Sequence, residues 1–103
     1  MLTVEEALDH LGYDETDDKI TRTVTAELEE AKAYLLGAVG ADTLELLPDD
    51  PRVNILIKAY LDDRHDDRGT TSAKAANAKR EQVHSTEWQL KMELARKREE
   101  VGA

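Results

Sequence analysis

The residues with the most obvious chemical potential lie in the segment LDDRHDDRG, residues 61–69, where a histidine and four aspartates occur together. Carboxylate oxygens and an imidazole can ligate Mg²⁺, Mn²⁺ or Zn²⁺, and His65–Asp66 is a bare His-Asp pair of the kind that metal-dependent hydrolases use. Such a site needs further ligands from other helices. The other two histidines, His10 and His84, stand in no metal-ligand pattern, so this reading is the weakest of three.

The same cluster has two readings without metal chemistry. On a helix, Asp62 and Asp66 share one face and Asp63 and Asp67 another, so like charges repel at the helix end that disfavours negative charge. One reading is a solvated helix end, partly neutralised by a contact from Asp62 to His65. The other is an acidic surface that lines a channel or faces a neighbouring subunit. We assign Asp62, Asp63, Asp66 and Asp67 to such a surface.

No other enzymatic motif is present. The sequence has no nucleophile paired with a base, no phosphate-binding glycine loop and no dinucleotide fingerprint, and KAANAKR offers three basic residues without aromatic partners. Residues 1–69 carry 18 acidic and 7 basic side chains, while residues 70–103 carry 5 and 7. An acidic body argues against binding of a phosphate backbone. We therefore expect no catalytic residue, no cofactor and no metal, and a protein that is not an enzyme.

The composition favours an all-α fold that holds these groups on helices. Hydrophobic residues make up 40% of 103 residues and Phe is absent, so a core of Leu, Ile, Val and Ala is expected. There is no cysteine and no apolar run near the ~20 residues of a membrane span. We expect a soluble intracellular protein without a membrane segment, built as a bundle of about four helices with a further C-terminal helix.

Local signals place the helices of a body that spans residues 1–69. A capping box of Thr3 and Glu6 starts the first helix, and Gly12 ends it. Aspartates at 14, 17 and 18 start a second helix, whose apolar stripe continues from Ile20 to Ala38, and residues 41–47 predict one or two further turns. Asp50 and Pro51 start a central helix. Its expected buried face comprises Val53, Leu56, Ile57, Tyr60 and Leu61, widened by Ile55 and Ala59.

The C-terminal third separates into two parts. Residues 70–84 read as a polar linker or an extension, since nothing larger than Ala is apolar between residues 69 and 82. A last helix over residues 85–103 is expected, capped by Ser85 or Thr86. It carries two narrow stripes on roughly opposite faces: Trp88, Met92 and Ala95 on one, and Leu90, Leu94 and Val101 on the other.

A small body cannot cover both stripes, so we expect this helix to touch two surfaces, at least one of them on another chain. The predicted interface residues are Trp88, Leu90, Met92 and Leu94, together with the basic Lys91, Arg96, Lys97 and Arg98, which are expected to pair with acidic groups of a neighbour.

The order of these features resembles the small head-tail connector proteins of tailed bacteriophages, also called adaptor or head-completion proteins. The resemblance rests on LTVEEALDHLGYD, DDKITRTVTAELEEAKAYLLGAVG and DPRVNILIKAYLDDRHDDRG, and covers about the first 69 residues. The matched elements are Leu11, Tyr13 and Asp14, then Ala31, Tyr34 and Leu35, then Asp50 to Val53 with Tyr60 and Arg64. The C-terminal third departs from the family, which often ends in a shorter Leu-rich helix.

The resemblance implies a structural subunit that assembles as a homo-oligomer ring below the portal protein of the capsid. Such a ring extends the DNA channel, lets DNA pass without sequence-specific binding, and offers a docking surface to a tail-side stopper or tail-completion protein. The implied location is the head-tail interface of the virion, after assembly in the bacterial cytoplasm. The alternative that the sequence leaves open is a small acidic phage-encoded module that binds and regulates a host protein.

Overall fold

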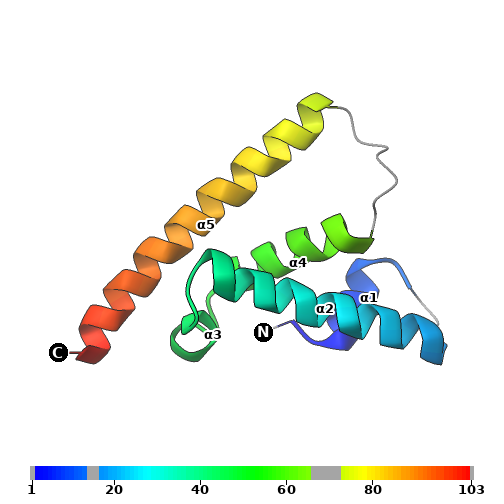
Figure 1. Ribbon diagram of the computed structural model, residues 1–103, viewed down its shortest axis with the longest axis horizontal. Helices are drawn as coiled ribbons and strands as arrows, with labels where there is room; N and C mark the ends of the chain where they lie inside the picture. Colours follow the sequence, from blue (N-terminus) through cyan, green and yellow to red (C-terminus); the bar gives the residue numbers. More distant parts are fainter. Residues whose placement is uncertain (1, 14–16, 66–72, 103) are drawn as a thin grey trace.

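The computed structural model describes residues 2–13, 17–65 and 73–102, with the side chains of residues 73–79 outside the description. Every regular element in the described part is a helix: α1 (Val4–His10), α2 (Asp18–Ala38), α3 (Thr43–Leu46), α4 (Pro51–His65) and α5 (Ala73–Gly102). The predicted all-α class is confirmed. Figure 1 shows α1 to α4 gathered into a body, with α5 lying diagonally beside it and reaching outward at both ends.

Side-chain caps start the helices where the sequence predicted them. The Thr3 hydroxyl accepts a hydrogen bond from the Glu6 N–H at 3.1 Å, and the Glu6 carboxylate accepts one from the Thr3 N–H at 3.3 Å. Asp17 accepts from the N–H of Ile20 at 2.8 Å. Asp50 accepts from the N–H of Arg52 at 2.9 Å. These bonds satisfy backbone donors that the first turn of a helix leaves without a partner.

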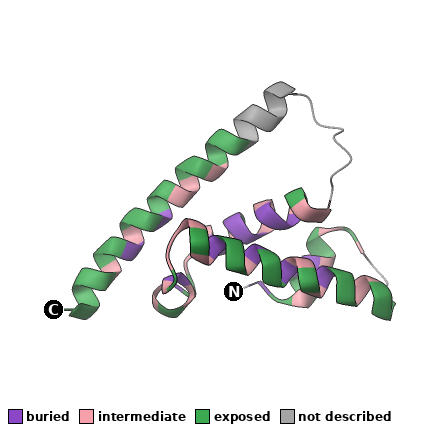
Figure 2. Ribbon diagram, viewed as in Figure 1, coloured by how far each residue is buried: buried purple, intermediate pink, exposed green. Residues whose placement is uncertain are grey.

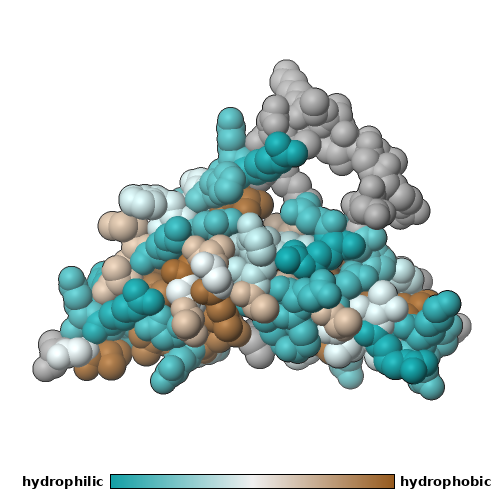
Figure 3. Space-filling view, viewed as in Figure 1, coloured by the Kyte–Doolittle hydropathy of each residue, from teal (hydrophilic) through white to brown (hydrophobic). Residues whose placement is uncertain are grey.

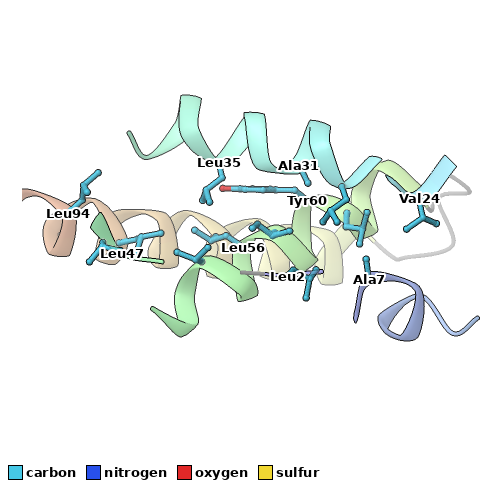
Figure 4. Packing of buried hydrophobic residues seen from close by; sticks show 14 residues of the cluster. Leu2, Ala7, Val24, Ala31, Leu35, Leu47, Leu56, Tyr60 and Leu94 are labelled. Carbon is cyan, nitrogen blue, oxygen red and sulfur yellow. The ribbon is translucent and has the colours of Figure 1, made fainter. Parts of the chain in front are cut away.

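Helix α4 is the centre of the packing, as its broad apolar face predicted. It contacts α1, α2 and α5. Its five predicted core residues are all buried, and so are four residues of the α2 stripe. Figure 4 shows Val24, Ala31 and Leu35 of α2 directed toward this core, and Figure 2 shows the buried positions on the inward faces of the helices. Ile55 does not widen the buried face: it is 54% exposed.

Helix α5 begins earlier than the sequence predicted. It runs unbroken from Ala73 to Gly102, and Thr86 is an interior residue, whose hydroxyl donates to the carbonyl of Gln82 at 2.8 Å. The expected start at Ser85 or Thr86 is therefore wrong, and residues 73–84 are a helical extension rather than a loop. Ala, Lys and Arg are strong helix formers, so this segment can stay helical without an apolar stripe. Residues 70–72 lie outside the described part.

Candidate functional site

The two apolar stripes of α5 have opposite environments. Leu90 and Leu94 are 0% and 1% exposed, whereas Trp88 and Met92 are 64% and 56% exposed. Successive helical residues are about 100° apart, so Trp88 lies about 200° from Leu90, as Met92 does from Leu94. The expectation that α5 has one apolar face on each side is therefore confirmed. The assignment of Leu90 and Leu94 to an interface with another chain is corrected, because their own chain buries them.

A polar contact fixes the far end of α5 against the body. Arg98 donates to the two carboxylate oxygens of Asp42, from Nε at 2.8 Å and from Nη2 at 2.5 Å. These hydrogen bonds hold the pKa of the Asp42 carboxyl below its usual range. Near the start of α4, Arg52 also donates to the backbone carbonyl of Gln89 at 3.4 Å. The outward direction of the Trp88 face follows from this attachment.

The four basic residues predicted to meet a neighbouring chain divide into two groups. Arg98 binds Asp42 of the same chain, Arg96 pairs with Glu93 and Glu100, and Lys97 pairs with Glu100 at 3.6 Å. These three side chains have acidic partners within the chain, and their pairing with acidic groups of a neighbour stays a prediction. Lys91 is exposed and forms no ion pair within the described residues, and its pairing with a neighbour also stays a prediction.

Trp88 and Met92 are exposed large hydrophobic side chains one turn apart on α5, and Val101 is another near the end of the helix. Charged and polar residues make up most of the remaining outer positions of this helix, and the face shown in Figure 3 is mainly hydrophilic, with hydrophobic areas scattered over it. Two large apolar side chains one turn apart on such a helix are typical of an association surface. We name Trp88 and Met92 the outer stripe.

A groove lies between α4 and the turns of α5 that precede Trp88. Its volume is about 530 Å³. The α4 side supplies Ile55, Leu56, Lys58, Ala59 and Asp62, and the α5 side supplies Gln82, Val83, Ser85 and Thr86. The exposed Ile55, which the sequence assigned to the core, is thus part of a surface groove. Ser85 lies one turn before Trp88, so the groove and the outer stripe are neighbouring features.

The acidic cluster does not behave as an isolated helix end. Oδ1 of Asp62 lies 2.8 Å from Nε2 of His10 in α1, a contact that the sequence did not suggest. The Asp62 side chain is 38% exposed. Asp63 is exposed. Asp66 and Asp67 lie outside the described residues, so the acidic surface is located only in its first half.

His65 belongs to a network of three side chains from three parts of the chain. Its Nδ1 lies 3.0 Å from Glu27 Oε2 in α2, and its Nε2 lies 2.9 Å from the Tyr13 hydroxyl, just after α1. The Glu27 side chain is 16% exposed. The donor and acceptor roles of the two ring nitrogens in these contacts depend on the tautomer. The network joins α1, α2 and α4 and is a structural use of the only histidine in the cluster.

The described residues contain no group of three or more His, Asp or Glu side chains placed to hold a metal ion. His65 faces Glu27 and Tyr13, while His10 faces Asp62, so the two imidazoles serve separate contacts. None of the described helices combines the length and apolar character that crossing a membrane requires.

Several residues that position the site were not identified from the sequence. Asp42, Glu27 and Tyr13 each bind a partner at least 38 positions away, and local spacing gives no signal for such pairs. Gly40 is a further case. A Cβ on Gly40 would lie 2.6 Å from Leu94 Cδ2 and 2.7 Å from Arg98 Nη2, so α5 packs directly on the glycine backbone.

Comparisons of this chain with protein-family models, with curated proteins and with solved structures found no match.

Proposed function

We propose that this chain is a structural subunit of a bacteriophage head-tail connector. In this role many copies form a ring below the portal, the ring extends the DNA channel, and its outer end provides a docking surface for the tail. Three sequence segments that resemble this family occur in the family's order within the first 69 residues. The proposed role depends on the shape and contacts of the subunit and involves no chemical reaction.

The observation that carries the proposal is the exposed outer stripe. Trp88 and Met92 remain 64% and 56% exposed while the opposite face of the same helix is buried. Exposed large side chains in a row are costly in a monomer, and aromatic anchors contribute strongly to protein interfaces. A repeated contact between copies would cover the stripe in every subunit of a closed ring.

The charge distribution suits a subunit that borders a DNA channel. The body is strongly acidic, and Asp62 and Asp63 remain accessible on α4. A wall of negative charge repels the phosphate backbone, whereas a wall of Lys and Arg would retain it. DNA would then pass the ring without being held.

Cosedimentation with tailless capsids tests the proposal. Portal-bearing capsids are mixed with the protein, pelleted and analysed for bound copies per capsid. We expect several copies per capsid, and the double variant Trp88→Ser/Met92→Ser should lose most of this binding. Val101→Ser is the matched control, since Val101 is 65% exposed on the same helix but outside the outer stripe. Wild-type protein that stays wholly in the supernatant would contradict the proposal.

A further inference from the structure

The groove between α4 and α5 has the character of a receptor for apolar side chains. Ile55, Leu56, Ala59 and Val83 provide an apolar lining, and Lys58 also lines the groove. Ile55 is 54% exposed even though it stands beside buried core residues. A site of about 530 Å³ is large enough for two medium or large side chains.

We infer that this groove receives the outer stripe, Trp88 and Met92, of a second copy of the same chain. The inference rests on the proposed self-assembly and names the two surfaces that meet. Trp88 and Met92 lie at i and i+4 on one face of α5, so both can enter one groove together. Every copy carries both surfaces, the outer stripe that inserts and the groove that receives it.

Charge favours a second copy over an unrelated partner. Lys91 follows Trp88 by three residues, is exposed, and forms no ion pair within the described part of the chain. Asp62 lines the groove, and its side chain is 38% exposed even while it binds His10. With the outer stripe of one copy in the groove of the next, the net-basic C-terminal third of one copy meets the net-acidic body of the other.

The amount of surface suits a repeated contact rather than an isolated pair. Stable complexes bury about 800 Å² per partner, which is more than a tryptophan and a methionine provide. The groove and the stripe of one copy can engage two different neighbours, so each subunit in a ring uses both. Contacts that are weak singly are then strengthened by closure of the ring.

Cysteine crosslinking tests which surfaces meet, because the chain has no native cysteine. Ala59→Cys in the groove and Met92→Cys on the outer stripe are made in separate proteins, mixed with tailless capsids, and oxidised. We expect a disulfide-linked pair containing one of each. Met92→Cys mixed with Ala26→Cys is the control, since Ala26 is exposed on α2, away from the groove. The first mixture should give at least ~10-fold more linked product, because binding holds the thiols at high effective concentration.

The outcomes separate this inference from the connector proposal. If several copies pellet with each capsid but the Ala59 and Met92 variants link no more than the control pair, the groove assignment is wrong and the connector proposal stands. Linked pairs in free solution without any capsid binding would support the groove and contradict the connector. A protein that carries both cysteines tests the ring arrangement. Oxidation to a ladder of linked multimers supports that arrangement, and a ladder that stops at the dimer overturns it.

Discussion

Arg98, near the end of α5, binds the carboxylate of Asp42, which stands 56 residues earlier at the start of α3. The contact fixes one end of α5, and the burial of Leu90 and Leu94 fixes its middle. Together they determine which face of the helix remains available. The exposure of Trp88 and Met92 is therefore a consequence of how α5 is attached to the body.

The Asp42–Arg98 pair predicts a loss of stability in acid. Hydrogen bonding to Arg98 lowers the pKa of Asp42 in the folded protein. The stabilisation is therefore fully present above the unfolded-state pKa of about 4, and is lost as the pH falls through the lowered folded-state value. Asp42→Asn should show a shallower decline in the free energy of unfolding between about pH 4 and pH 2 than wild type. Asp50 is also lowered, by Arg52, so some decline remains. Urea titrations at several pH values would measure this, and identical slopes would argue against the pair.

Alanine substitutions at Gly40 and at Gly37 should change the free energy of unfolding in opposite directions. Gly40→Ala would place Cβ against Leu94 and Arg98 and should reduce the free energy of unfolding by about 1–3 kcal/mol, as overpacking does. Gly37 lies in α2 with nothing within 4 Å of its Cβ position. Gly37→Ala should stabilise the protein by up to about 1 kcal/mol, because alanine favours the helix. Thermal unfolding of both variants is the measurement, and equal effects would mean that α5 does not pack on Gly40.

Substitutions at Leu94 and at Met92 should separate the contribution of α5 to folding from its contribution to assembly. Leu94→Ala removes a fully buried side chain and should cost about 2–5 kcal/mol of stability. Met92→Ala alters an exposed side chain and should change the stability of the monomer by less than about 0.5 kcal/mol. Denaturant unfolding of the dilute protein compares the two. A large loss in the Met92 variant would place that side chain in the core.

His65 predicts a structural cost when its ring is removed. His65→Ala leaves the half-buried Glu27 carboxylate and the Tyr13 hydroxyl without their shared partner, and should cost about 1–3 kcal/mol. His84→Ala is the matched control, since the His84 side chain is 75% exposed. Unfolding midpoints in urea would show the difference. If the two alanine variants unfold alike, the network contributes nothing to the body.

Helix starts could be predicted because their chemistry is local. Thr3 with Glu6 and Asp50 with Pro51 each satisfy or remove backbone donors within a few residues, and the structure bears out both starts. The start of α5 could not be found in this way. Residues 73–84 lack an apolar stripe, and Ser85 and Thr86 resemble helix caps. Both nevertheless lie inside a continuous helix, because the residues before them have high helix propensity.

The candidate site was only partly predictable, because facing surfaces depend on tertiary packing. Spacing identified two stripes on α5 but could not tell which one the body covers. The burial of Leu90 and the exposure of Ile55 both depend on where α5 packs against the body. The contacts of His10 and His65 join residues 52 positions apart, a separation at which sequence patterns give no register.

We propose that copies of this chain assemble as a ring at the portal vertex. Electron microscopy of the purified protein, alone and mixed with tailless capsids, tests it most directly. We expect rings in solution or new density at one capsid vertex, and loss of both in Trp88→Ser/Met92→Ser but not in Val101→Ser. Folded, concentrated protein that forms no ring and leaves every vertex unchanged would contradict it, and would make a module that binds a host protein the leading alternative.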